Sequence, residues 1–131
     1  MNGKREPPQD VDDLARAVIG AAIEVHRELG PGFPEIVYEA ALAVELDVRH
    51  VPFVRQYAMK VAYKGIVVGE GRADFLVRER LIVEIKAVSA LAPVHEAQVV
   101  AYLKATGISL GLLLNFNCAV LKDGIKRLVL T

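Results

Sequence analysis

Three ionisable residues interrupt two apolar segments in the middle of the chain, and their spacing could support metal-dependent chemistry. Asp74 lies in residues 72–78, and Glu84 and Lys86 lie in residues 81–88. Because side chains alternate along a strand, Glu84 and Lys86 share one face of theirs. If a three-residue turn joins the two segments, Asp74 lies opposite Glu84. The pattern therefore predicts two neighbouring carboxylates with a lysine beside them.

Such a pair of carboxylates needs a compensating charge. Inside a sheet they repel each other and are costly to desolvate, unless a cation neutralises them or one takes up a proton. Oxygen ligands suit a hard ion such as Mg²⁺, which keeps several waters and completes its shell with substrate phosphate oxygens. Lys86 could then position, or help to deprotonate, an attacking water. The short pattern leaves an alternative open, in which Asp74, Glu84 and Lys86 form an ion pair on a solvent-facing sheet edge.

The elements that must position these residues follow from hydrophobic periodicity. Apolar residues at three- and four-residue spacing predict helices over residues 11–29, 34–49 and 93–106. Residues 1–9 are polar and are expected to form a flexible tail, so that one domain spans residues 10–131. Extended segments are expected at residues 53–63, 66–68, 72–78, 81–88, 110–116 and 125–130. The order predicts an α/β domain with a mixed sheet.

Composition excludes several classes of protein. The 131 residues are 53% apolar and 24% charged, which is typical of a globular domain. Lys plus Arg and Asp plus Glu number 16 each, so any nucleic-acid binding must use a local patch. The single Cys118 allows no intrachain disulfide. No apolar run approaches the roughly 18 residues of a membrane span, so we expect no membrane association and a cytoplasmic location.

A longer pattern covers nearly the whole chain after the tail. The segment containing Gly32, Glu35 and Tyr38 resembles the signature of the bacterial GxxExxY protein family, which is assigned to the PD-(D/E)xK nuclease superfamily. The resemblance continues through residues 71–74, 83–88, 93–98, 114–117 and 122–127. It implies a restriction-endonuclease-like core, in which helices flank a mixed central β-sheet.

The resemblance also implies roles for individual residues. Asp74 and Glu84 would be ligands of Mg²⁺ or Mn²⁺, and Lys86 would be the lysine associated with the attacking water. Glu35 would supply an additional acidic group from a helix. Ala73 stands where the superfamily name has Pro, and this departure removes no ligand.

Four further candidates are a glutamine, two tyrosines and a histidine. Gln98 and Tyr102 lie four residues apart, hence on one helix face, and resemble the Q-x-x-x-Y element of the recombination-exonuclease branch of the superfamily. The resemblance implies that they line the active site; the alternative is a hydrogen-bonded Gln beside a partly buried Tyr. Tyr38 and His26 are supporting candidates. His26 could equally pack near its helix end, and its spacing from other His and Cys residues suggests no zinc site.

The leading hypothesis is therefore a Mg²⁺- or Mn²⁺-dependent phosphodiesterase that hydrolyses nucleic acid, with DNA favoured. A homodimer is expected, because a domain this small offers little surface to grip a duplex. A non-catalytic binding or scaffold module is the alternative. The zero net charge supports it, since phosphate neutralisation normally dominates nucleic-acid affinity. A hydrolase of another phosphoester also stays open, because a fold does not determine a function.

Overall fold

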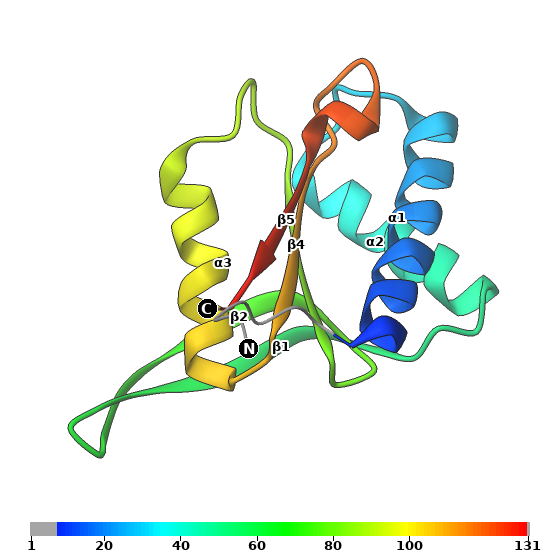
Figure 1. The fold of residues 1–131 in the computed structure, drawn as a ribbon. Coiled ribbons are helices and arrows are strands. Elements are labelled where there is room, and N and C mark those ends of the chain that lie inside the picture. The colour runs from blue at the N-terminus through cyan, green and yellow to red at the C-terminus, as the bar shows by residue number, and fades with distance from the viewer. Residues whose placement is uncertain (1–7, 131) are drawn as a thin grey trace, which may run out of the picture.

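A mixed five-stranded sheet with helices on both faces forms the framework of the protein (Figure 1). The structure, a computed structural model, describes residues 8–130. The predicted tail therefore lies outside the described residues up to residue 7, and the first helix already includes Gln9. The elements in chain order are α1 Gln9–Leu29, α2 Glu35–Val48, β1 Phe53–Tyr63, β2 Ile66–Val77, β3 Leu81–Lys86, α3 Pro93–Thr106, β4 Leu110–Asn115, a 3₁₀ turn η1 Leu121–Gly124 and β5 Ile125–Val129.

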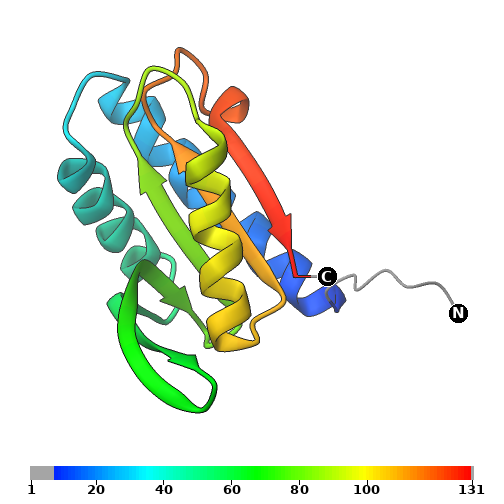
Figure 2. The same cartoon turned by 90° about the vertical axis from the view of Figure 1, so that its left-hand side faces the viewer.

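The strands are arranged in chain order, β1-β2-β3-β4-β5. All neighbouring pairs are antiparallel except β3 and β4, which run parallel with Leu81 beside Leu110 and Lys86 beside Asn115. A parallel pair needs a crossover connection, and α3 supplies it by running back along one face of the sheet (Figure 2). The predicted α/β class with a mixed sheet is confirmed.

Each face of the sheet has its own apolar core. On one face α1 and α2 pack on β-strand residues such as Val83 and Ile85. On the other face α3 packs through Val99 and Leu103 on the alternate side chains, including Ile82. Because both faces are covered, every residue of β4 is buried, which explains its uninterrupted apolar sequence. β3 and β4 are therefore shielded from water on both sides.

Two strand predictions differ from the structure. The segments predicted at residues 66–68 and 72–78 are one 12-residue strand, β2, because the Gly69–Gly71 region pairs with β1 instead of turning. The strand predicted at residues 81–88 ends at Lys86. Beyond it the Asn115 side chain binds both the N–H and the carbonyl of Val88, each at 3.0 Å. Hydrogen bonds to the Asn115 side chain thus take the place of strand pairing at Val88.

No helix within residues 8–130 has the length and apolar character needed to cross a membrane.

Gly111 of β4 lies directly beneath α3, and its lack of a side chain allows the helix to pack closely on the sheet. A Cβ at this position would lie 2.6 Å from a methyl of the buried Val99. We expect Gly111→Ala to lower the unfolding free energy by about 1–3 kcal/mol, since overpacking forces the helix outward. Urea unfolding measures this change. Gly69→Ala is the control, because no atom lies within 4 Å of its Cβ position; equal stability of both variants would contradict the prediction.

Candidate metal centre

Asp74 and Glu84 meet where β2 and β3 stop pairing. The last paired residues on this side of the ladder are Phe75 and Val83. Beyond them the Asp74 N–H donates to Glu84 Oε1 at 2.7 Å, and the Ile85 N–H donates to Asp74 Oδ2 at 2.8 Å. The two carboxylates thus bind backbone donors that the separating strands would otherwise leave unpaired. The turn between β2 and β3 consists of residues 78–80. It has the three residues that were expected to place Asp74 beside Glu84.

Lys86 lies on the same face of β3 as Glu84, as strand alternation predicts. Its Nζ is 4.0 Å from Glu84 Oε2, and the two side chains are only 16% and 5% exposed. β3 is also the central strand of the sheet. These positions do not fit the alternative of an ion pair on a solvent-facing edge. The lysine is held beside a largely buried carboxylate.

The charges around the two carboxylates are not balanced. Burial raises the pKa of Glu84 to about 7, and the negative charge of Asp74 adds to that shift. Burial also raises the pKa of Asp74, although its hydrogen bond from Ile85 acts in the opposite direction. Glu35 contributes further negative charge to both groups. The arrangement would therefore be stabilised by a cation or by a proton.

Helix α2 brings two acidic residues towards this pair. Glu35 lies in its exposed first turn, and Glu39 follows one helical turn later with only 6% of its surface exposed. Glu39 Oε2 accepts from Arg55 Nη2 at 3.1 Å, and Glu39 Oε1 accepts from Gln56 Nε2 at 3.0 Å. The same Gln56 amide donates to Asp74 Oδ1 at 3.2 Å.

Glu39 and Gln56 were not among the site residues predicted from the sequence. The spacing of Glu39 from Glu35 was an available signal, because residues four apart share a helix face. No comparable signal marks Gln56, since its part in the site depends on the contact between β1 and β2. Only the tertiary structure therefore identifies Gln56 as a neighbour of Asp74.

Gln98 and Tyr102 form a hydrogen-bonded pair on the sheet side of α3. Gln98 Nε2 donates to the Tyr102 hydroxyl at 3.1 Å. The Tyr102 ring lies over Gly71 of β2, where a Cβ would be 2.8 Å from the ring. Within residues 8–130 neither side chain has a hydrogen bond to Asp74 or Glu84. Tyr102 therefore lies over the strand that carries Asp74, and the pair is not hydrogen-bonded to the two carboxylates.

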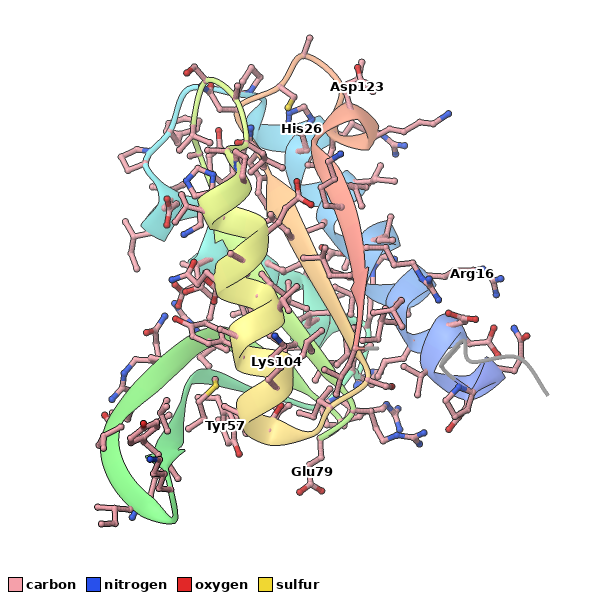
Figure 3. The ribbon with its side chains drawn as sticks, turned by 60° about the vertical axis from the view of Figure 1, so that its left-hand side comes forward. Arg16, His26, Tyr57, Glu79, Lys104 and Asp123 are labelled. Carbon is pink, nitrogen blue, oxygen red and sulfur yellow. The ribbon has the colours of Figure 1, made fainter. Side chains whose placement is uncertain are left out.

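Tyr38 and His26 each form a hydrogen bond to a backbone carbonyl in a loop. Tyr38 is fully buried, and its hydroxyl donates to the Gly30 carbonyl at 2.6 Å, which holds the connection that leads to Glu35. His26, labelled in Figure 3, donates from Nε2 to the Cys118 carbonyl at 2.8 Å. Neither contact involves the carboxylates of Asp74 and Glu84.

The donors present suit a magnesium-like ion better than a structural metal. Within residues 8–130, no three or more His, Cys, Asp or Glu side chains are grouped closely enough to hold one ion. The candidate protein ligands are the two carboxylates of Asp74 and Glu84. Mg²⁺ is commonly held by one or two carboxylates, with waters and substrate phosphates completing its shell. Structural zinc needs four protein ligands.

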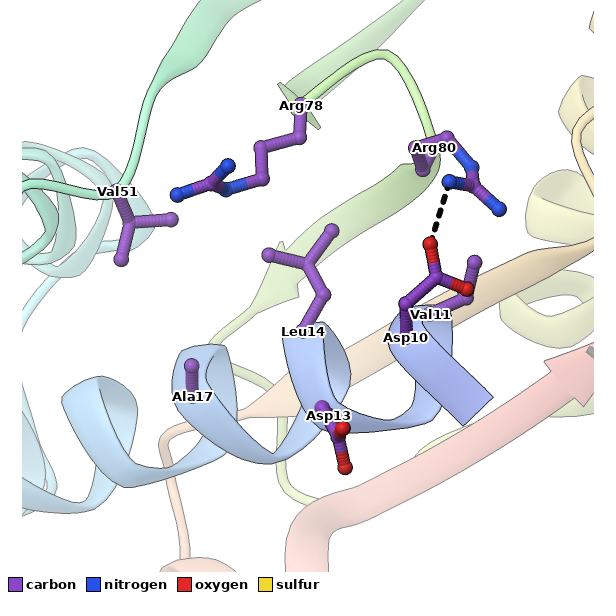
Figure 4. Close-up of a pocket in the computed structure, with 8 residues that line it drawn as sticks. All are labelled: Asp10, Val11, Asp13, Leu14, Ala17, Val51, Arg78 and Arg80. Atoms are coloured by element: carbon purple, nitrogen blue, oxygen red, sulfur yellow. Dashed lines mark hydrogen bonds and ion pairs between the residues drawn. The ribbon is translucent and has the colours of Figure 1, made fainter. Parts of the chain in front are cut away.

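A cavity of about 440 Å³ lies elsewhere, between α1 and the turn after β2 (Figure 4). Arg78 and Arg80 line it together with Asp10 and Asp13, and Arg80 Nη1 pairs with Asp10 Oδ2 at 2.7 Å. None of its lining residues belongs to the carboxylate pair. Its charges compensate one another, so it is a surface feature separate from the metal centre.

The architecture and the site define an α/β domain whose central strands carry a D…ExK arrangement. The sequence pattern of the PD-(D/E)XK nuclease superfamily matches residues 12–128 of the chain. The match covers almost all of the sequence, and the protein belongs to this superfamily.

Solved structures agree with that assignment at the level of the fold. One of them, "Crystal structure of SSO0001", is 21% identical to this chain and superposes with a TM-score of 0.50. The superposition covers 70% of this chain and 46% of the other, so the chain spans about half the length of that protein. No curated protein matches the chain.

The raised pKa of Glu84 makes the stability of the metal-free protein depend on pH. Between its ordinary value of 4.5 and about 7, the folded state binds more protons than the unfolded state. The free energy of unfolding should therefore fall as pH rises through this window, by at most about 1.4 kcal/mol per pH unit. Urea unfolding in a chelator, at several pH values, measures the slope.

Glu84→Gln should flatten this slope, because the amide does not titrate. The substitution leaves groups remote from the site unchanged, so the difference between the two slopes reports on Glu84 together with the adjacent Asp74, whose charge is coupled to it. Identical slopes for wild type and variant would contradict the assignment of the raised pKa.

Proposed function

We propose that this protein is a divalent-metal-dependent nuclease and that it belongs to the GxxExxY group within its superfamily. The observation that carries the proposal is the pair Asp74 and Glu84, held side by side on central strands with more negative charge than their neighbours compensate. Membership of a nuclease superfamily supports it. A cytoplasmic location stays a prediction from sequence.

In this proposal Asp74 and Glu84 hold Mg²⁺ or Mn²⁺ through their carboxylate oxygens. The bound ion would polarise the scissile phosphate and lower the pKa of a bound water. Lys86, kept beside Glu84, orients the attacking water and balances developing negative charge. Glu35 adds an acidic group at the edge of the site, and Gln98 with Tyr102 lines the surface over β2.

We propose DNA as the substrate, gripped in part by the β1–β2 hairpin. This hairpin extends beyond the helices at the lower left of Figure 1, and its strand β2 also carries Asp74. Lys60, Lys64 and Arg72 give it an excess of positive charge over Glu70. A two-stranded ribbon enters the wide major groove of B-DNA, whereas the major groove of duplex RNA is too narrow for such contacts.

The first test combines metal binding with cleavage. Isothermal titration of Mg²⁺ and Mn²⁺ should show binding to the wild type that is lost in the Asp74→Asn/Glu84→Gln double variant. Cleavage of plasmid and linear DNA should fall by roughly 10²-fold or more in Asp74→Asn and in Lys86→Ala, a typical cost of losing a catalytic acid–base group. Asp123→Asn, an exposed change at η1, is the control and should retain full activity.

Turnover by purified Asp74→Asn or Lys86→Ala at the wild-type rate would refute the nuclease proposal. A wild type that neither binds metal nor shows salt-sensitive DNA binding would favour the second candidate, a binding or scaffold module. The specific observation for that candidate is the zero net charge of the chain. Binding of DNA without cleavage, with the metal site occupied, would also favour it.

We further propose that the protein acts as a homodimer through α2. This helix presents an apolar stripe to solvent, with Ile36, Val44 and Val48 each more than 60% exposed at spacings that place them on one face. An antiparallel pair of α2 helices from two copies would bury both stripes against each other.

A charge within this stripe should separate the two copies. Val44→Glu is expected to shift the mass measured by light scattering from dimer to monomer, because the interface would bury unpaired carboxylates. Val94→Glu, at a site 68% exposed on α3, is the matched control and should stay dimeric. A monomeric wild type at high concentration would refute the proposal.

A further inference from the structure

We infer that Gln56 is a positioning residue for Asp74, anchored in turn by the buried Glu39. The role rests on the proposed metal-dependent function, because it concerns how the metal-binding carboxylate is held. Its evidence is nevertheless separate: the backbone of Gln56, the two hydrogen bonds of its amide and the burial of its anchor.

In the β1–β2 hairpin, the alternation of side chains between the two faces of the sheet reverses at Gln56 and Asp74. On β2, Phe75 packs in the core beneath α1 and α2, whereas Ala73, two residues away, packs beneath α3. On β1, Phe53 and Tyr57 divide between the two cores in the same way. Residues two apart in a regular strand share a face, so the pleat must reverse between them.

The reversal is caused by one residue in an unfavourable conformation. Gln56 has a φ of 51°, which lies in the left-handed region. Pairing between β1 and β2 skips Gln56 and Asp74 while the residues on either side keep their register. Glutamine has neither the freedom of glycine nor the short side chain that lets asparagine adopt this conformation. A residue held in such a conformation points to a local function for its side chain.

The Gln56 side chain bridges two carboxylates. Its Nε2 donates to Glu39 Oε1 at 3.0 Å and to Asp74 Oδ1 at 3.2 Å. Glu39 cannot move freely, because it is buried and its other oxygen accepts two hydrogen bonds from Arg55. The order of support therefore runs from Arg55 through Glu39 and Gln56 to Asp74.

This bridge completes the orientation of the Asp74 carboxylate. One oxygen, Oδ2, is already bound by the Ile85 N–H. The contact from Gln56 to Oδ1 fixes the rotation of the carboxylate plane, and each oxygen keeps a lone pair for a cation. Partners that orient a metal ligand typically change metal affinity by 10–100-fold when they are removed. We expect an effect of this size at Gln56.

The test uses two substitutions that separate backbone from side chain. Gln56→Gly keeps the left-handed backbone without strain but removes the amide, and Gln56→Met keeps the length of the side chain but has no N–H donor. Both should weaken Mn²⁺ binding, measured by isothermal titration, by roughly 10-fold or more. The melting temperature of Gln56→Gly should stay close to that of the wild type. Arg78→Gly, which replaces another residue with a left-handed backbone (φ of 49°), is the matched control and should bind Mn²⁺ normally.

A second measurement does not depend on metal. The side-chain amide of Gln56 should show protection from hydrogen exchange by NMR, and this protection should fall in Asp74→Ala and in Glu39→Ala. Unchanged protection in Asp74→Ala, or Mn²⁺ affinity in Gln56→Gly equal to that of the wild type, would overturn the inference. Failure of the proposed function has a different signature: a wild type that binds no metal and cleaves nothing while the Gln56 amide stays protected.

Discussion

The site depends on the separation of β2 from β3 directly after the pair Phe75 and Val83. Two backbone N–H groups lose their ladder partners at that point, and buried donors of this kind must be paired. The carboxylates of Asp74 and Glu84 accept these hydrogen bonds. The same contacts bring two carboxylates together inside the sheet, so the strand separation also creates the need for a compensating cation or proton.

The two helical layers contribute unequally to this arrangement. Helix α2 delivers Glu35 and Glu39, which add negative charge, and Arg55 compensates only the second of them. Helix α3 contributes neutral groups, the hydrogen-bonded Gln98 and Tyr102 over β2. The excess of negative charge therefore comes from the side where α2 meets the sheet. On the opposite face, α3 adds only uncharged side chains over β2. Positive charge is instead found on the β1–β2 hairpin, at Lys60, Lys64 and Arg72.

Much of the framework could be read from local patterns. Periodic apolar residues located the three helices, and a continuous apolar run located β4, because burial on one or both faces leaves a direct trace in sequence. The predicted bounds were wrong for two strands. At the end of β3 a side chain takes the place of backbone pairing, and in β2 a glycine-rich segment continues to pair. Asn115 ends β3 early by binding Val88, and the glycine-rich part of β2 continues as strand.

By itself the sequence determined the class of the fold, which follows from the order of helices and strands. It also determined the adjacency of Asp74 and Glu84 and the position of Lys86, which follow from strand alternation and a three-residue turn. The tertiary structure alone decided which further side chains support them. Gln56 reaches Asp74 through a left-handed backbone, and Glu39 reaches Gln56 across the boundary between a helix and the sheet. Such contacts join residues far apart in the chain, and no local periodicity records them.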